Sequence, residues 1–367
     1  MKVLVLNAGS GSQKISLYDL GATLPAAPST PLWAAYADWN EQPGTVLAHL
    51  TQGGTTTTRT YTDPDRGVVM SALARELWAG DHPAIAGPEA IDLIGHRVVH
   101  GGPNYRQSTF ITPAVKEAIA EYEKVAGSHN RNTLQGITLM DHLFPGTPQM
   151  AAFDTAFHAH LPLAAAVYPG PYAWFTQGIR RYGFHGLSHQ YAAERAAALL
   201  GQDPATLRLV TCHLGGGCSL AAVQGGHSIN TTMGFTPLEG LMMNNRSGSV
   251  DPGVLIFLLR YGGYTVEQLD RTLHEESGLE GISGSANDLR ELLAADPAIH
   301  PRARLAIDIY VQRLREGIGA MVASLGGLDA LVFTGGVGEH LAAIRAEASA
   351  PFAFMGLTID AARNAQA

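Results

Sequence analysis

Lysine is scarce in this chain of 367 residues, which contains only Lys2, Lys14, Lys116 and Lys124. Arginine therefore supplies most of the 24 positive charges, and with 32 acidic side chains the formal net charge is −8 at pH 7. A chain with this balance is not suited to nucleic acid or to an anionic membrane as its main partner. Lys14 stands out because it follows a run of small residues.

Cysteines and long apolar runs are also few. Cys212 and Cys218 alone cannot form a disulfide framework or a zinc site, so we expect two buried thiols in a reducing cytoplasm. The longest apolar run, about residues 254–259, is far too short to span a membrane. The apolar run at the N-terminus is too short for a signal peptide. The length and the 46% apolar content predict a cytoplasmic globular chain of two or three domains.

A glycine- and serine-rich turn, NAGSGSQK at residues 7–14, follows an apolar run near the N-terminus. A P-loop would need Ser or Thr where Ile15 stands and a helix after it, but residues 14–20 are typical of a strand. The stretch therefore predicts a hairpin of strands 2–7 and 14–20, with a turn whose backbone can approach a phosphate. Residues 208–224 repeat the pattern around glycines 215–217, which predicts two related halves with Asn7 and His213 at equivalent places.

A third glycine-rich segment differs because it leads into a helix. Residues 330–333 predict a strand, and residues 334–340 (TGGVGEH) predict the start of a helix. This arrangement suits a nucleotide phosphate, although a tight turn alone would also explain the glycines. The remaining pattern predicts helices at 67–80 and 113–125, and strands at 91–100 and 149–153.

Four groups of polar residues are candidates for chemistry. Arg97 and Arg246 lie in apolar surroundings beside glycines and could bind carboxylate or phosphate, or form structural ion pairs. Asp154 follows a predicted strand and could orient a metal, take a proton or cap the next segment. His185 precedes a glycine and could donate to transition-state charge or be a core histidine. Residues 288–290 could contact a ribose or adenine, or cap a helix.

These stretches together resemble the acetate kinase family across almost the whole chain. The matching segments, in order, are LVLNAGSGSQK (4–14), HRVVHGG (96–102), FDTAFH (153–158), GIRRYGFHGLSH (178–189), HLGGGCSLAAV (213–223), TTMGFTPLEGLMM (231–243), RSGSVDPG (246–253), SGLEGISGSANDLR (277–290) and GGLDALVFTGGVGEH (326–340). The order and number of the segments make the resemblance specific.

The resemblance implies an α/β fold of two duplicated ribonuclease-H-like domains, of the actin, sugar-kinase and Hsp70 type, with nucleotide in an interdomain cleft. The expected boundaries are 1–154 and 155–367. The implied activity is reversible transfer of the ATP γ-phosphoryl group to acetate, giving acetyl phosphate and ADP, with Mg²⁺ or Mn²⁺, in a cytoplasmic homodimer. Propionate or butyrate kinase activity, or an inactive nucleotide-binding homologue, are the alternatives.

The resemblance also implies a set of site residues. Arg97, Asp154, His185 and Arg246 would be catalytic, and Asn7 would help to hold the metal. Acetate would meet Arg97, Val99, His129, Phe184 and Pro237. The nucleotide would meet Ser10, Ser12, Lys14, His213, Leu214, Gly215, Gly216, Gly217, Asp288, Leu289, Arg290, Gly336, Val337, Gly338, Glu339 and His340.

Four features depart from the family pattern. Ser128-His129-Asn130-Arg131 replaces Leu-His-Asn-Pro near the acyl pocket, which predicts a more polar pocket. Gly216 replaces an Asn, which removes one side-chain contact to phosphate. Asn244-Asn245 replace Gly-Thr. The family continues beyond position 367 through a strand and a helix with an acidic metal ligand, so weaker Mg²⁺ binding and a less stable first domain are expected.

Overall fold

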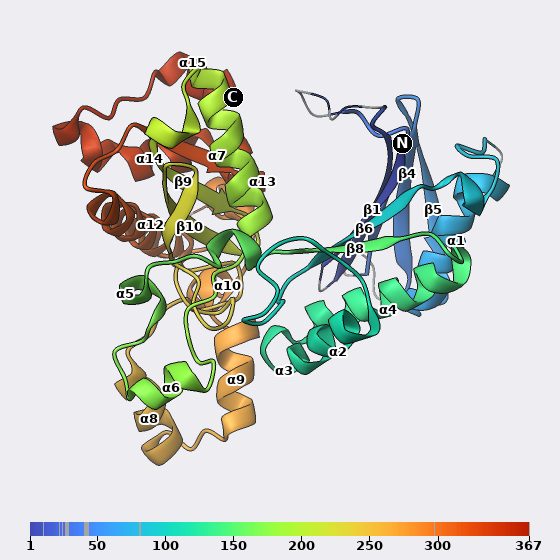
Figure 1. Cartoon of the computed structure of the whole chain (residues 1–367). Coiled ribbons are helices and arrows are strands. Elements are labelled where there is room, and N and C mark those ends of the chain that lie inside the picture. Colours follow the sequence, from blue (N-terminus) through green and yellow to red (C-terminus); the bar gives the residue numbers. More distant parts are fainter. Residues whose placement is uncertain are drawn as a thin grey trace. The chain divides into compact units, whose positions relative to one another are not determined.

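The computed structural model describes residues 1–9, 11–21, 23, 25, 29–39, 44–80, 82–296 and 298–366. The chain forms two compact units, Met1–Ala156 and Phe157–Ala367, each built around its own sheet (Figure 1). Among the described helices, none is both long and apolar enough to cross a membrane. The two units are described separately below.

The first unit contains an eight-stranded mixed sheet in the order β5-β4-β3-β2-β1-β6-β8-β7. Its strands are β1 (Lys2–Ala8), β2 (Ser12–Asp19), β3 (Trp33–Asp38), β4 (Val46–Gln52), β5 (Thr55–Tyr61), β6 (Leu93–Val98), β7 (Thr109–Phe110) and β8 (Gln149–Phe153). Its helices are α1 (Arg66–Ala79), α2 (Pro113–Glu121), α3 (Glu123–Ala126) and α4 (Ser128–Leu143), with a short 3-10 helix at Pro88–Ala90.

The core of the first unit lies between the sheet and helices α1 and α4. Leu4 and Leu6 of β1 pack in one apolar cluster with Leu73 of α1 and Met140 of α4. Successive strand residues point to opposite faces, so Asn7 points away from these helices. The polar side chain of Asn7 therefore lies near the end of β1, on the face of the sheet opposite the core.

The predicted helix at 113–125 is broken in the structure, so this prediction was wrong in its length. Helix α2 ends before Tyr122, and α3 begins after it. The Tyr122 ring stacks on His100 with the ring centroids 4.5 Å apart and packs against Gly102. This tertiary contact fixes Tyr122 in a non-helical conformation. The predicted strand at 91–100 is likewise shorter, because β6 spans Leu93–Val98.

The second unit contains a four-stranded sheet in the order β11-β10-β9-β12. Its strands are β9 (Arg208–Leu214), β10 (Cys218–Gln224), β11 (His227–Thr231) and β12 (Ala330–Thr334). Its helices are α5 (Leu163–Ala166), α6 (Tyr172–Thr176), α7 (Gly186–Leu200), α8 (Pro252–Tyr261), α9 (Val266–Glu275), α10 (Gly278–Ser283), α11 (Leu289–Ala294), α12 (Ala303–Leu325), α13 (Gly335–His340), α14 (Ala342–Ser349) and α15 (Ala361–Gln366). Short 3-10 helices lie at Ala156–His158, Pro204–Thr206 and Ala350–Met355.

The second sheet is covered on both faces. Ala193 and Ala197 of α7 pack with Ala221 and Val223 of β10 on one face. On the other face α12 comes so close that a Cβ at Gly317 would lie 2.7 Å from a methyl carbon of Leu220. A sheet enclosed in this way is apolar on both sides, and β10 is buried along nearly its whole length.

The two sheets share one arrangement of four strands, β3-β2-β1-β6 in the first and β11-β10-β9-β12 in the second. β1 pairs antiparallel with β2 and parallel with β6, and β9 pairs antiparallel with β10 and parallel with β12. Asn7 and His213 are each the residue before last in the first strand of their hairpin. The predicted repeat, including the equivalence of these two residues, is therefore confirmed.

Candidate functional site

In the first unit, polar residues meet where parallel strands end. Leu6 of β1 is in register with His96 of β6, and Val98 of β6 is in register with Phe153 of β8. Asn7, Arg97 and Asp154 therefore lie next to one another at the carboxyl ends of adjacent strands, which is where α/β sheets place ligands. The structure brings these three predicted residues together.

The guanidinium of Arg97 links the other two side chains. Its Nε lies 3.1 Å from both oxygens of Asp154 and its Nη2 lies 2.5 Å from Oδ2, while Nη1 donates to Oδ1 of Asn7 at 3.1 Å. The side chain of Asp154 is 2% exposed and that of Arg97 is 25% exposed. Burial lowers the pKa of Arg97, but the Asp154 carboxylate outweighs burial and the net shift is upward. The ion pair expected as one alternative is present.

Lys14 lies within β2 rather than in the turn before it. It is directly opposite Asn7 in the antiparallel pair, so the two side chains project from the same face of the sheet. Its Nζ lies 5.7 Å from the centre of the Tyr36 ring. Ser12 opens β2, and its carbonyl accepts a hydrogen bond from the Gly9 backbone. Ser10 lies outside the described residues.

Oxygen donors for a divalent cation are present in this unit, but they do not form a complete site. Asn7 Oδ1 and the Asp154 carboxylate both accept hydrogen bonds from Arg97 and are hard ligands of the kind Mg²⁺ prefers. No group of three or more histidine, cysteine or acidic side chains in the described part of the chain is arranged to hold a metal. The donor set therefore fits an ion that takes most of its ligands from water and phosphates.

The residues assigned to the acyl group fall in both units. Val99 is 5% exposed and follows β6, and His129 is the second residue of α4. The hydroxyl of Thr133 donates to the carbonyls of both His129 and Arg97, which ties α4 to the strand that carries Arg97. Phe184 and Pro237 belong to the second unit. Phe184 is a core side chain, 1% exposed.

His185 has an unusual backbone conformation in the second unit. Its φ of 57° is the one positive value found among the described residues other than glycine, and strain of this kind often accompanies functional positions. It precedes α7, and its Nδ1 lies 2.9 Å from the hydroxyl of Ser219 on β10. The centroids of the His185 and His213 rings are 4.3 Å apart. Nδ1 of His213 lies 2.8 Å from the Ser188 hydroxyl.

A chain of hydrogen bonds continues from His185 into the core. The Ser219 hydroxyl is 2.7 Å from Nε2 of His189, and Nδ1 of His189 is 2.8 Å from the Thr211 hydroxyl. Burial holds the pKa of His189 well below its ordinary value, so this imidazole is neutral. This imidazole therefore links the hydroxyls of Ser219 and Thr211, donating to one of them and accepting from the other. The sequence analysis missed Ser219 and His189.

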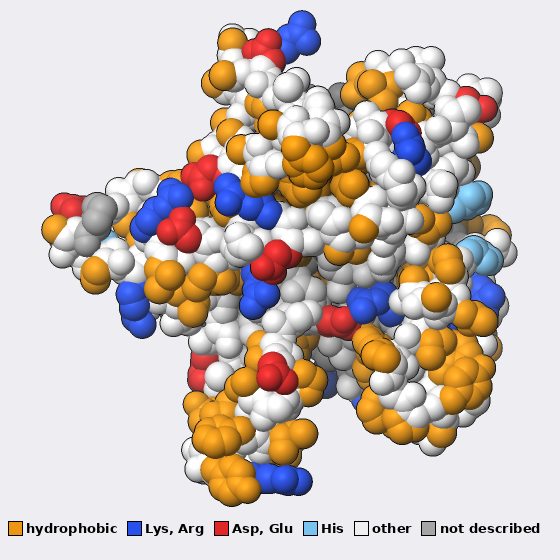
Figure 2. Space-filling view, turned by 90° about the vertical axis from the view of Figure 1, so that its left-hand side faces the viewer, with side chains coloured by type: hydrophobic (Ala, Val, Ile, Leu, Met, Phe, Trp, Pro, Cys, Tyr) orange, Lys and Arg blue, Asp and Glu red, His pale blue; other side chains and the backbone are white. Residues whose placement is uncertain are grey.

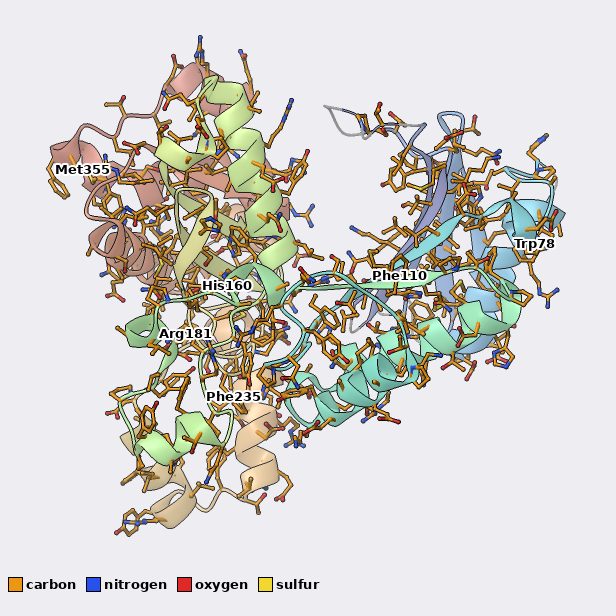
Figure 3. The ribbon with its side chains drawn as sticks, in the orientation of Figure 1. Trp78, Phe110, His160, Arg181, Phe235 and Met355 are labelled. Atoms are coloured by element: carbon orange, nitrogen blue, oxygen red, sulfur yellow. The ribbon has the colours of Figure 1, made fainter. Side chains whose placement is uncertain are left out.

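A salt bridge fixes the segment that carries His185. Arg181 pairs with Glu239 at 2.7 Å and donates to the carbonyls of Thr232 and Met233. Arg181 and Phe235 both lie in this part of the second unit, where loops replace regular structure (Figure 3). Arg181 therefore has a structural role, holding residues 178–186 against the loop that contains Pro237.

Arg246 approaches the glycine turn of β9 and β10. A Cβ at Gly217 would lie 3.8 Å from Nη1 of Arg246 and 3.4 Å from Nε2 of His185. Arg246 donates to the carbonyl of Pro237 at 3.2 Å, and no carboxylate in the described part of the chain pairs with it. Burial lowers the pKa of its guanidinium. The guanidinium of Arg246 and the imidazole of His185 therefore both lie beside the backbone of Gly217, which has no side chain.

A cavity of about 220 Å³ opens beside the same turn. It joins three of the segments that the sequence analysis assigned to the nucleotide. Its lining consists of Gly215, Gly216, Asn244, Asp288, Leu289, Arg290, Gly336, Val337, His340 and Leu341. Asn244 was noted in the sequence only as a departure from the family pattern, and Leu341 was not noted.

Three further nucleotide candidates of the second unit, Leu214, Gly338 and Glu339, do not line the cavity. Leu214 is fully buried, Gly338 packs against Phe333, and Glu339 is exposed with its carboxylate accepting from Thr334. Asp288 caps α11 by accepting from the backbone of Arg290, whose side chain it also binds as an ion pair. The helix cap expected as an alternative is present, and the same residues still face the cavity.

Gly335 joins β12 to α13 in a conformation that needs glycine. Its φ is 79°, and a Cβ there would lie 2.5 Å from the carbonyl oxygen of Leu214. Any side chain would be both strained and in collision with backbone. The start of α13 is therefore held directly against the end of β9, beside the cavity.

Comparisons with known proteins agree along the full chain. The acetokinase family model matches residues 2–367. The acetate kinase of Gloeobacter violaceus is 56% identical over 366 residues, which cover 99% of this chain and 90% of that protein.

Two solved structures share the fold. The acetate kinase of Porphyromonas gingivalis is 37% identical with a TM-score of 0.88, and the alignment covers 99% of this chain and 90% of that one. A propionate kinase from Francisella tularensis is 36% identical with a TM-score of 0.90, over 100% and 91% of the two chains. The expected α/β fold class is confirmed.

Proposed function

The chain belongs to the acetokinase family, and from this premise we propose that it transfers the γ-phosphoryl group of ATP reversibly to acetate, giving acetyl phosphate and ADP. The resemblance predicted from the sequence is confirmed by the family match. The observation that carries the proposal is the position of His185 and Arg246 beside Gly217, next to the cavity lined by Gly215 and Gly216.

The chemistry asks for positioning and charge neutralisation more than for a base. Acetate is already ionised at neutral pH, so the nucleophile needs no proton removed, but it must approach an anionic phosphoryl group. No carboxylate in the described part of the chain pairs with Arg246, so its charge is available to the migrating phosphoryl group. His185, whose Nε2 also lies beside Gly217, donates from that nitrogen to the same group.

The first unit supplies a second cation and the acidic centre. Arg97 binds acetate through its guanidinium, and Asp154 orients that guanidinium through the hydrogen bonds already described. Lys14 contributes charge to the nucleotide from the face that it shares with Asn7. Val99, His129, Phe184 and Pro237 limit the acyl chain. Asp154 and Asn7 would hold Mg²⁺ or Mn²⁺, which neutralises phosphate charge when bound.

The nucleotide occupies the cavity of the second unit. Its phosphates lie along Gly215, Gly216 and Gly217 with His213 and Leu214 behind them. Ser10 and Ser12 are further nucleotide contacts that the family resemblance implies. Asp288, Leu289 and Arg290 contact the adenosine. Gly336, Val337 and His340 line the same cavity, with Gly338 and Glu339 between them in the chain, and Arg345 holds this segment by donating to the carbonyls of Gly338 and Glu339.

A homodimer in the cytoplasm completes the proposal. Helix α8 contributes no buried residue, and Val254, Ile256, Phe257, Leu259 and Tyr261 are between 41% and 75% exposed. Hydrophobic side chains gather at the lower end of the second unit, where α6 and α8 lie (Figures 1 and 2). A contiguous apolar surface of this kind suits a self-complementary interface. The two buried cysteines are unpaired, which suits a reducing compartment.

An acyl hydroxamate assay tests the activity directly. The purified chain is incubated with ATP, Mg²⁺ and acetate, propionate or butyrate, and the acyl phosphate is trapped with hydroxylamine. The expected result is product from all three acids with the highest kcat/KM for acetate. A higher kcat/KM for propionate would favour the activity named for the Francisella structure, and no product from any acid would refute the proposal.

A further inference from the structure

The side chain of Asn244 lies beside Gly216, the glycine of the turn at which the family pattern has an asparagine. Asn244 and Gly216 line the same cavity. The amide nitrogen Nδ2 of Asn244 is 3.8 Å from the point that a Cβ of Gly216 would occupy, and no other described atom is within 4 Å of that point. The amide therefore borders the space that the missing side chain leaves.

The backbone of Asn244 is fixed while its side chain is available. Its backbone nitrogen donates to the carbonyl of Gly216 at 3.4 Å, and its carbonyl accepts from Glu280 at 3.0 Å. Its side-chain amide forms no hydrogen bond with any residue that the structure describes. The amide of Asn245, by contrast, donates to the carboxylate of Glu280 and the carbonyl of Glu275. The two neighbouring asparagines thus differ in what their amides can bind.

The cavity has few other free donors for an anion. Arg290 is held by Asp288 in an ion pair with Nη2 and Oδ2 2.5 Å apart. The remaining lining groups are glycines, apolar side chains and His340. A phosphate in this cavity would therefore need donors from the backbone of the turn and from an amide beside it.

We propose that the side-chain amide of Asn244 donates a hydrogen bond to a phosphate of the bound nucleotide, in the place left open by Gly216. This inference rests on the proposed function, because it takes the cavity as the nucleotide site. Asn244 is a binding residue in this account and takes no part in bond making or breaking.

Titration calorimetry with ADP and with adenosine tests the assignment on the full chain. Asn244→Ala should weaken ADP binding about tenfold, since one hydrogen bond to a charged group is lost. It should leave adenosine binding within twofold of the unchanged protein. Equal weakening for both ligands would refute a phosphate contact, and so would an unchanged affinity for ADP. Asn245→Ala is the matched control and should leave ADP affinity within twofold.

A compensating pair of substitutions separates binding from folding. Gly216 has space for a side chain, so Gly216→Asn combined with Asn244→Gly should restore ADP affinity to within about threefold of the unchanged protein. Failure to restore it, with an unchanged melting temperature, would contradict the proposal. If the unchanged protein forms acyl phosphate and Asn244→Ala binds ADP normally, only this inference fails. If the unchanged protein binds no ADP, the proposed nucleotide site fails with it.

Discussion

The carboxylate of Asp154 is almost completely buried against the guanidinium of Arg97, with three N···O distances between 2.5 and 3.1 Å. The two residues come from neighbouring parallel strands, so their pairing depends on the register of β6 and β8. Arg97, the proposed acetate-binding residue, and Asp154, which orients its guanidinium, therefore both belong to the first unit.

Removing Arg97 should therefore affect both stability and activity. Arg97→Ala leaves a buried carboxylate without its partner, which should lower the free energy of unfolding by roughly 3 kcal/mol. Urea denaturation and hydroxamate assays on the same preparation measure the two effects. Arg208→Ala breaks the half-exposed pair with Asp329 and should cause a smaller loss of stability with normal activity. An Arg97→Ala protein as stable as the control variant would contradict the account.

Removing Arg246 should affect activity but not stability. Because burial disfavours its charge and no described carboxylate pairs with it, Arg246→Ala should leave the melting temperature unchanged or higher. The same substitution should lower kcat about a thousandfold, since it removes a charge aimed at the phosphoryl group. Arg313→Ala, on the exposed face of α12, controls for loss of a positive charge. A turnover within tenfold of normal would exclude the proposed role.

Ser219 is expected to act on turnover through His185. Ser219→Ala removes the hydroxyl that meets Nδ1 of His185, so the imidazole loses a hydrogen bond that fixes its orientation. We expect kcat to fall about tenfold with KM for ATP and acetate nearly unchanged, and Ser219→Thr to recover part of the loss. The pH profile of kcat should shift in Ser219→Ala. A change confined to KM, with the pH profile unmoved, would show that Ser219 acts elsewhere.

Acid should destabilise the first unit through a buried histidine. Burial lowers the pKa of His96 to about 4, and its imidazole meets the Gln149 side chain at 2.6 Å. The unfolded chain takes up this proton near pH 6.5, whereas the folded chain does so only near pH 4, so stability falls as the pH drops through that window. The contribution lost by pH 5 is about 2 kcal/mol. Urea unfolding between pH 7 and 5 should show a shallower decline in His96→Gln, and an identical slope would count against this assignment.

The exposed face of α8 should control the oligomeric state. Phe257 is 58% exposed, and Phe257→Asp should convert a dimer to a monomer in light scattering coupled to size exclusion, because it places a charge in an apolar interface. Phe354→Asp is the control, since Phe354 is 85% exposed and adjoins Met355 at the other end of the second unit (Figure 3). A monomeric unchanged protein would remove the basis for the proposed interface.

Local patterns predicted the elements that carry the site. The turn residues of both hairpins, the strand before Asp154 and the strand-to-helix change at Gly335 can each be read from a few neighbouring residues. The internal repeat followed from them, and the α/β class followed from the resemblance to the acetate kinase family. The break at Tyr122 was missed because it depends on a ring contact with His100, which lies 22 positions earlier in the chain.

Long-range relations were beyond the sequence. An ion pair of Arg97 was one of two alternatives, and its partner was not predicted, because the pairing with Asp154 depends on which strands are neighbours. The role of Ser219 and His189 depends on the distance between β10 and α7, for which no local pattern exists. Asn244 was recognisable only as an unusual residue, since its relation to Gly216 depends on a loop that closes over the turn.

The conformation of Gly335 restricts which residue relatives of this protein can have at this position. Its backbone angle and its contact with Leu214 exclude every other residue, so almost any missense change in its codon would disturb the wall of the nucleotide cavity. The position is therefore a marker: a relative that keeps glycine there can retain this geometry, and one that does not must have rebuilt the end of its β9 strand. A single column of a future alignment would thus sort relatives by whether this part of the cavity survives, without a structure of each.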